Sequence, residues 1–268
     1  MTKMGLLACA MSIALLLSAL PADAQLTNYT QGFDDVPGIF ATGGWVFDNL
    51  SNPPSESQPP PPTGFWAQGL PGVGLGAFGD NAQAGPTNSF ITVTFESGLG
   101  TGAAVSNWLL TPELTFSNGS VISFYTEQSP LNIVDPNRLQ VRLSLNGAST
   151  NVGTQPTTVP GTQPSFGDFT SLLADINPNY VEAPMPGAYP TTWTQESFVI
   201  SGLTVPTTGR IGFLYLLTNS TFPTPGQGSI IGIDSFALTT VPEPPQMTLL
   251  GLAGLGLVFF KRREWRPS

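Results

Sequence analysis

Carboxylates are the side chains of this sequence best suited to chemistry. The chain contains no histidine and one cysteine, Cys9, which excludes Ser-His-Asp hydrolysis, Cys-His proteolysis and histidine-based zinc or copper sites. Hydrolysis of a glycosidic bond needs two carboxyl groups facing each other across a sugar, roughly 5 to 9 Å apart. The acids that could serve are Asp80, Glu96, Glu113, Glu127 and Glu196. Their spacing pairs none of them, so we assign no catalytic residue and expect no enzyme.

Aromatic side chains offer a second kind of site, because an exposed indole can stack on a sugar ring. Trp66 and Trp193 lie in turn-rich segments and are the candidate carbohydrate-binding residues. Trp45 and Trp108 lie in apolar surroundings and are expected in the core. The glycine-rich segment 69–76 has no clear strand before it and no helix after it, which favours a loop over a phosphate site.

The stretch 241–268 combines three features in a fixed order. Pro242-Glu243-Pro244 cannot continue a strand or a helix, because each proline fixes φ and removes a donor. An uncharged apolar run follows from Met247 to Phe260, and the basic residues Lys261, Arg262 and Arg263 come next. The run is shorter than the roughly 20 residues of a full membrane span. Flanking side chains can lengthen it by snorkelling, and the basic end would then be cytoplasmic; a buried core helix is the alternative.

This order of motif, apolar run and basic end resembles the PEP-CTERM sorting signal of Gram-negative bacteria. In that family the Pro-Glu-Pro motif, here Pro242-Glu243-Pro244, is recognised by an exosortase, a membrane transpeptidase-like enzyme. The resemblance implies an exosortase and the inner membrane as partners, followed by delivery to the cell surface or the extracellular matrix. Proteins of this type accompany biofilm formation, which makes extracellular polysaccharide a further possible partner.

The N-terminal segment 1–24 has the pattern of a secretory signal peptide. Lys3 supplies the positive charge, an apolar stretch extends from Gly5 to Leu20, and Ala22-Asp23-Ala24 gives a small-residue cleavage site. We expect cleavage between Ala24 and Gln25. The segment 6–9 resembles a lipoprotein box but comes too early. Removal of Cys9 with the signal would leave a mature chain without disulfides.

The segment 25–240 is long enough for one ordinary β-domain with its own core. The whole chain carries a formal net charge of −9, and Arg138, Arg142 and Arg210 are the only basic residues of this segment. Such a charge pattern gives no footprint for nucleic acid.

Short alternating runs between turn clusters predict strands, because 27 prolines and 30 glycines interrupt any helical period. Residues 138–145 alternate strictly, which predicts a half-buried strand with Leu139 inside and Arg142 in solvent. Residues 168–175 are expected to contain one helical turn. Strands are also expected at 90–95, 198–200, 211–217 and 230–238, with a hairpin joining 114–116 to 121–125 through Asn118-Gly119.

Several short motifs along this segment resemble the choice-of-anchor J domains, which are similar to MAM and cleaved-adhesin modules. They are Gly32-Phe33-Asp34-Asp35, Gly44-Trp45, 106–114 (SNWLLTPEL), 138–147 (RLQVRLSLNG) and Gly232-Ile233-Asp234-Ser235-Phe236. The resemblance implies an all-β fold, namely a single jelly-roll β-sandwich of the galactose-binding-like type. The signal peptide and the expected transmembrane helix would flank it.

That resemblance also implies a cation site. In jelly rolls of this kind the first and last strands lie side by side and can hold calcium, which takes 6 to 8 oxygen ligands. Asp34 and Asp35 near the first strand and Asp234 in the last strand would supply carboxylates. Alternatively, Asp34 and Asp35 cap a turn before Pro37, and Asp234 bonds a neighbouring loop.

Two functions remain open at this stage. The favoured one is a non-enzymatic exported surface or matrix protein, sorted by an exosortase and linked to exopolysaccharide or biofilm. The alternative is a carbohydrate-binding module that carries a membrane anchor, which ranks ahead of a weak glycoside hydrolase with the same anchor.

Overall fold

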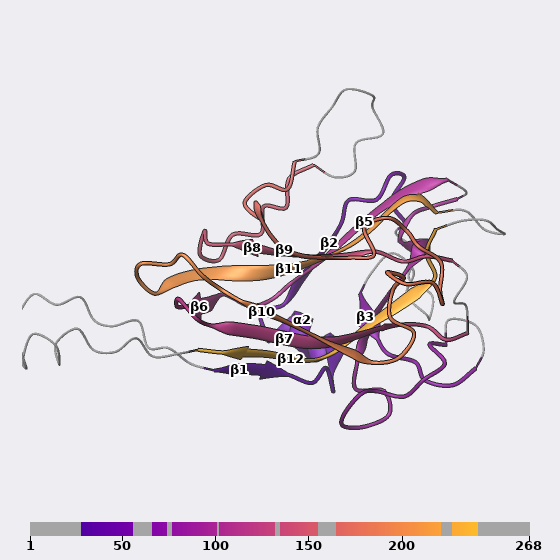
Figure 1. The fold of residues 1–268 in the computed structure, drawn as a ribbon, viewed down its shortest axis with the longest axis horizontal. Helices are drawn as coiled ribbons and strands as arrows, with labels where there is room; N and C mark the ends of the chain where they lie inside the picture. The colour runs from indigo at the N-terminus through magenta and orange to yellow at the C-terminus, as the bar shows by residue number, and fades with distance from the viewer. Residues whose placement is uncertain are drawn as a thin grey trace, which may run out of the picture.

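The computed structural model describes residues 28–55, 66–73, 77–100, 102–131, 135–154, 165–220 and 227–240. They form two six-stranded antiparallel sheets that lie face to face as a β-sandwich (Figure 1). The predicted signal peptide and sorting signal lie outside the described residues. Within these ranges, no helix has both the length and the apolarity needed to cross a membrane.

The first sheet is built around its long strand β12 (Ile230–Thr239) and is called the β12 sheet below. Its strand order is β10-β7-β12-β4-β3, with β1 paired to the far end of β12. The bounds of its other strands are β1 Tyr29–Gln31, β3 Ala67–Gln68, β4 Ile91–Thr94, β7 Val121–Gln128 and β10 Thr194–Val199.

The second sheet is built around β11 (Thr207–Ser220) and is called the β11 sheet. Its order is β2-β5-β11-β8-β9, with β6 paired to the start of β11. The bounds of its other strands are β2 Val46–Asn49, β5 Ala103–Leu110, β6 Leu114–Phe116, β8 Leu139–Ser144 and β9 Ser171–Ile176. A short helix, α2 (Val36–Ala41), follows β1, and a 3₁₀ turn, η2 (Phe95–Ser97), follows β4.

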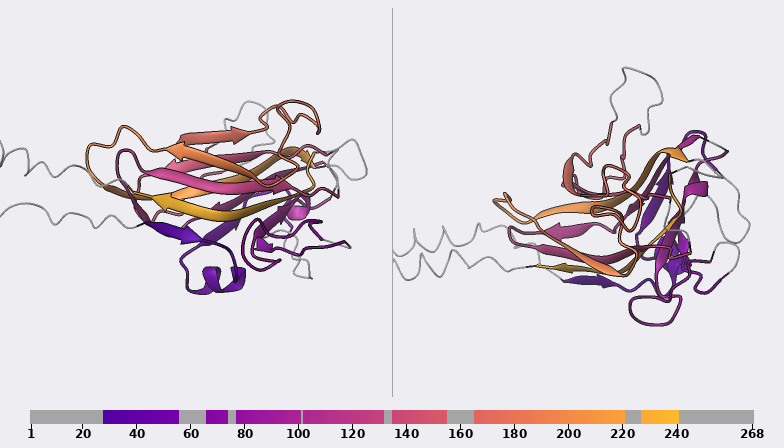
Figure 2. Two further views of the ribbon diagram at one scale, coloured as in Figure 1. Left: turned by 60° about the horizontal axis from the view of Figure 1, so that its bottom comes forward. Right: turned by 45° about the vertical axis from the view of Figure 1, so that its right-hand side comes forward.

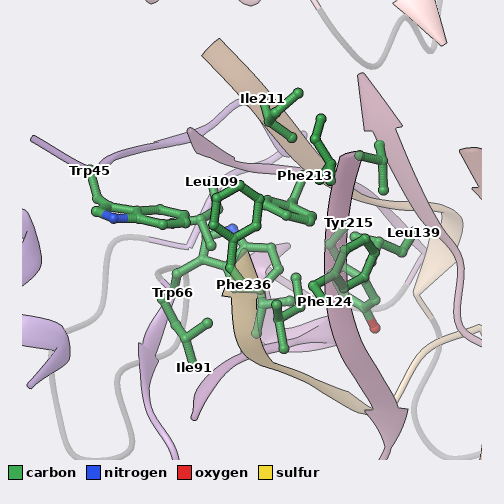
Figure 3. Packing of buried hydrophobic residues seen from close by; sticks show 14 of the residues in the cluster. Trp45, Trp66, Ile91, Leu109, Phe124, Leu139, Ile211, Phe213, Tyr215 and Phe236 are labelled. Atoms are coloured by element: carbon green, nitrogen blue, oxygen red, sulfur yellow. The ribbon is translucent and has the colours of Figure 1, made fainter. Parts of the chain in front are cut away.

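The core lies between the two sheets and is rich in aromatic rings (Figure 3). Phe213 of β11 meets Phe124 of β7 edge to face at 5.0 Å between ring centroids, and it meets Phe236 of β12 at 6.0 Å. Trp45 meets the other side of Phe236 at 5.7 Å. These contacts join the layers, because edge-to-face pairs add stability beyond the apolar area that they bury.

The outer face of the β11 sheet carries a second apolar layer. Trp108 and Leu214 project from the sheet, and Val152 and Phe169, from residues 145–154 and 165–170, pack on them. Figure 2 shows the two sheets and their covering segments from two further sides. The part of the outer face around Trp108 is therefore covered.

The predicted all-β sandwich is confirmed, as are a central strand over 211–217 and the pairing of the first strand with the last. Trp45 and Trp108 are core residues as predicted, 2% and 0% exposed. Residues 168–175 do not form a helical turn, because Ser171–Ile176 pairs with β8 as an edge strand.

Two other predictions were wrong because of distant contacts. The expected hairpin through Asn118-Gly119 does not form: β6 pairs with β11 and β7 pairs with β12, so this turn carries the chain from one sheet to the other. Arg142 does not face solvent and is 6% exposed, because Phe166 and Phe169 lie over its side of β8.

Candidate functional site

The candidate site lies on the outer face of the β12 sheet, under segment 77–90. Three aromatic rings hold this segment in place: Phe78 stacks on Trp193 at 5.7 Å, and Phe90 meets both. The indole N–H of Trp193 donates to the backbone oxygen of Asn81 at 2.8 Å. The rings lie over Gly232 of β12, where a Cβ would come within 2.8 Å of the Trp193 indole. The aromatic cover therefore depends on a glycine in the strand beneath it.

Asp234 projects from β12 into the same segment. Its carboxylate accepts the backbone N–H of Ala84 at 3.1 Å and that of Ser235 at 2.5 Å. The side chain is fully buried. Burial raises the pKa of Asp234, and the backbone N–H groups of Ala84, Ser235 and Gln83 partly offset that rise. Asp234 thus ties segment 77–90 to the last strand, as the second interpretation of its role expected.

Asp34 reaches segment 77–90 from the first strand. It follows β1 after Phe33, whose φ of 56° turns the chain. The hydroxyl of Ser89 donates to Asp34 Oδ1. A Cβ on Gly85 would lie 3.3 Å from the same oxygen, and this glycine has a φ of +79°. The pairing of β1 with β12 therefore brings Asp34 and Asp234 to one loop.

Asp35 does not join them. It is the N-cap of α2 and accepts the backbone N–H of Gly38 at 3.1 Å, which is the ordinary role of aspartate at a helix start. In the part of the chain that the structure describes, no three acidic, histidine or cysteine side chains are grouped so as to hold a metal. The three predicted ligands Asp34, Asp35 and Asp234 are therefore not grouped around one point, and calcium binding there stays a prediction.

Glu127 is the most unusual side chain of this surface. It lies on β7 opposite Gly232 and is 0% exposed. Among the described residues, no donor forms a hydrogen bond with either carboxylate oxygen. Burial and, after it, the contact with the Asp80 carboxyl and its charge raise the pKa of Glu127 to about 8, and the backbone of Trp193 lowers it in part. Sequence reasoning named Asp80 and Glu127 only as possible catalytic acids and gave no sign that they meet.

The two candidate carbohydrate residues differ in their surroundings. Trp66 is 2% exposed within the main core, so it cannot stack on a sugar, and that prediction is corrected. It precedes β3, which pairs with β4 and carries its indole inside the sandwich. Trp193 is partly exposed at the start of β10 and remains a candidate.

The β11 sheet presents a separate polar cluster. Arg138 donates to both carboxylate oxygens of Asp175 at 2.8 and 2.6 Å, and Gln140 donates to the same carboxylate at 2.8 Å. Bidentate pairs of this kind fix geometry strongly. All three side chains are already paired, so the cluster links β8 to the edge strand β9.

Comparison with known proteins gives likenesses to solved structures alone. No protein-family model matches the chain, and no curated protein matches it. It is similar to the K1 cleaved adhesin domain of Lys-gingipain from Porphyromonas gingivalis W83, with 16% identity, a TM-score of 0.44 and coverage of 81% of this chain and 99% of that one. The K3 cleaved adhesin domain of the same protein gives 15% identity, a TM-score of 0.41 and coverage of 80% and 98%. The family 11 carbohydrate-binding module of Clostridium thermocellum gives 9% identity, a TM-score of 0.31 and coverage of 82% of this chain and 100% of that one.

Proposed function

We propose that this chain is an exported, non-enzymatic protein of the cell surface or extracellular matrix of a Gram-negative bacterium. An exosortase would act on it at Pro242-Glu243-Pro244, while the apolar run 247–260 holds it in the inner membrane. The resemblance of this stretch to a sorting signal motivates the proposal, and the placement of the two ends of the sandwich supports it.

Those two ends lie at the same edge of the molecule. Tyr29 pairs with Leu238, and the backbone N–H of Thr240 donates to Asn28 Oδ1 at 2.9 Å. The proposed motif begins two residues after Thr240. A sandwich held this way would present its opposite end, the right-hand end in Figure 1, away from the membrane. Gly232, under Trp193, is about 23 Å along β12 from Thr239 at the usual rise of about 3.3 Å per residue.

The carboxylates support a non-enzymatic role. A glycosidase keeps its two carboxyl groups at least about 5 Å apart so that the reacting sugar and water fit between them. Here Asp80 lies close enough to Glu127 to raise its pKa through side-chain contact, and Glu127 has no exposed surface. A sugar cannot enter between them.

Mass spectrometry of the mature protein from its host, with and without the exosortase, tests the sorting proposal. We expect an N-terminus at Gln25 in both strains and loss of the segment beyond about Pro244 only when the enzyme is present. A Glu243→Ala variant should keep its C-terminus, whereas Pro245→Ala, outside the motif, should be processed normally. An intact C-terminus in both strains would overturn the proposal and leave the tail a plain anchor.

Carbohydrate binding at Trp193 is the second candidate function. Its indole is held by a ring contact with Phe78 and a hydrogen bond to Asn81, so little side-chain freedom would be lost on binding. It also lies at the end of the sandwich that we expect to face outward. A partly exposed, rigidly held indole is the kind of surface on which a sugar ring stacks.

Affinity electrophoresis in host exopolysaccharide tests this candidate. We expect Trp193→Ala to weaken retention about tenfold, which corresponds to about 1.4 kcal/mol. Val199→Ala, which removes a 62% exposed side chain from the same strand, is the matched control and should change nothing. Equal retention of both variants and the unaltered protein would eliminate Trp193 as a sugar-binding residue.

A further inference from the structure

Glu127 is a buried carboxylate whose surroundings do not explain it. Its side chain has no exposed surface, and among the described residues no donor bonds either oxygen. Asp234, on the neighbouring strand and the same face, shows the ordinary solution, because backbone N–H groups of Ala84 and Ser235 satisfy its oxygens. The Asp80 carboxyl and the Trp193 backbone come close enough to Glu127 to act on its pKa, but among the described residues no donor reaches its oxygens with ordinary hydrogen-bond geometry.

Burying an unpaired carboxylate costs several kcal/mol unless a proton or a cation neutralises it. The charged group that acts on Glu127 is a second carboxyl, that of Asp80, which makes the local charge more negative. Arg138, Arg142 and Arg210, the arginines of the described chain, belong to the β11 sheet or its outer face. No basic side chain of the described residues forms an ion pair with Glu127 or Asp80.

Asp80 is exposed whereas Glu127 is not. The Ser129 hydroxyl donates to the backbone oxygen of Phe78, and the Trp193 indole donates to that of Asn81, so the residues on both sides of Asp80 are held next to the end of β7. Asp80 is therefore the solvent-facing member of the pair. Two carboxylates offer up to four oxygens, and water can supply the remaining ligands from the Asp80 side. This donor set suits hard divalent cations, which take carboxylate, carbonyl and water oxygens.

We propose that Glu127 and Asp80 bind a hard divalent cation between segment 77–90 and β7. The bound cation neutralises the buried carboxylate and fastens the loop that carries the Trp193 contact. This site is separate from the Asp34–Asp234 pair, which reaches the loop farther along, at Ala84 and Ser89. It goes beyond the proposed sorting function and does not depend on it.

The test uses the full chain, purified in detergent and stripped with a chelator. Calcium binding is measured by titration calorimetry. Terbium luminescence excited through tryptophan gives a local signal, since Trp193 lies beside the site and Tb³⁺ is a hard cation with oxygen ligands. The variants are Glu127→Gln, which keeps the shape of the side chain, and Asp80→Asn, whose exposed position makes misfolding unimportant. Asp234→Asn is the matched control on the same face.

We expect Glu127→Gln to bind one calcium ion fewer than the unaltered chain. Its tryptophan-sensitised terbium emission should be at least tenfold weaker. Asp80→Asn should weaken calcium binding at this site at least tenfold, while Asp234→Asn keeps the terbium signal. Unchanged calcium binding and emission in both Glu127→Gln and Asp80→Asn would overturn the proposal. Loss of all cation binding in Asp234→Asn alone would overturn it too, by placing the cation at the Asp34–Asp234 pair.

Discussion

The guanidinium carbon of Arg142 lies 3.3 Å from the centroid of the Phe166 ring. Its Nε donates to Gln140 at 2.9 Å, and its Nη1 donates to the backbone oxygen of Phe169 at 3.2 Å. Burial lowers the pKa of Arg142, and the charge of Asp175 partly offsets this. A buried cation is thus held by a ring face and two hydrogen bonds, which fixes segment 165–170 on the β11 sheet.

Replacing Phe166 by alanine should destabilise the sandwich. The change removes the ring that covers Arg142, and desolvated cation–π contacts contribute about 2 kcal/mol. We expect Phe166→Ala to lower the free energy of unfolding in urea by about 2 to 3 kcal/mol, counting the lost ring burial. Leu172→Ala, at a 49% exposed position on nearby β9, should cost less than about 0.5 kcal/mol. A double-mutant cycle with Arg142→Met that gives no coupling would show that the ring contact contributes nothing.

Gly232→Ala should loosen the aromatic cover of the candidate site. The new Cβ would lie 2.8 Å from Cη2 of Trp193 and 3.1 Å from Cζ of Phe78. The strand would have to push the indole away, at a cost of about 1 to 3 kcal/mol. We expect a lower melting temperature and a red-shifted Trp193 emission, measured against Trp193→Phe to isolate that indole. Gly32→Ala, where a Cβ meets nothing closer than 4.0 Å, is the control.

The predictable part of the fold comes from local periodicity. Continuous apolar residues over 211–217 indicate a central strand because such a strand is buried on both faces, and the structure places it between β5 and β8. Asn118-Gly119 did not predict the strand pairing correctly, because this turn sequence also occurs where the chain reverses between two strands that do not pair with each other. Here the backbone N–H of Gly119 bonds to Ile200, a residue far along the chain, and not to a neighbouring strand.

The candidate site was less predictable for a similar reason. Glu127 stands at a position of β7 that alternation assigns to solvent, but it is buried, and the groups that act on it come from distant parts of the chain, namely Asp80 and Trp193. Trp66 has loop neighbours in sequence, but the two-residue strand that follows places it in the core. The proximity of Asp34 and Asp234 was predicted because the family resemblance implied that the first and last strands lie side by side. No sequence signal marked Ala84 or Ser89 as their partners.

In the absence of cations, Glu127 should make stability depend on pH. Its pKa is raised from 4.5 to about 8 by burial and by Asp80, so between those values the folded state binds more protons than the unfolded state. The stabilising contribution is complete below about pH 4.5 and is lost as pH rises to about 8, with a slope of up to about 1.4 kcal/mol per pH unit. Urea unfolding in chelator from pH 5 to 8.5 measures it.

The informative quantity is the difference between the unaltered chain and Glu127→Gln, because other carboxyl groups titrate in both proteins. We expect the difference in free energy of unfolding between the two proteins to shrink by a few kcal/mol on acidification, because the unaltered chain becomes more stable relative to the variant. Added calcium should reduce the loss of stability near pH 8 in the unaltered chain only. Parallel pH profiles of the two proteins would show that Glu127 is ionised and well solvated in the folded state.

Asn137 links the two sheets through a buried hydrogen-bond network. Its Nδ2 donates to Gln128 of β7 at 3.0 Å and to the Ser229 hydroxyl at 2.9 Å. Its Oδ1 accepts from the Tyr215 hydroxyl of β11 at 2.7 Å and from the backbone N–H of Ser229 at 2.9 Å. The side chain has no exposed surface. One amide therefore satisfies groups of both layers at once.

Asn137→Ala should be among the most damaging single changes, because it leaves several buried polar groups without partners. Each such group costs about 1 to 3 kcal/mol, so we expect a loss of at least about 3 kcal/mol. Tyr215→Phe removes one hydrogen bond of the same network and should cost only about 1 to 2 kcal/mol. Chemical denaturation of the two variants, followed by circular dichroism, gives both values. If Asn137→Ala costs no more than Tyr215→Phe, water replaces the amide, and the network does not hold the two sheets together.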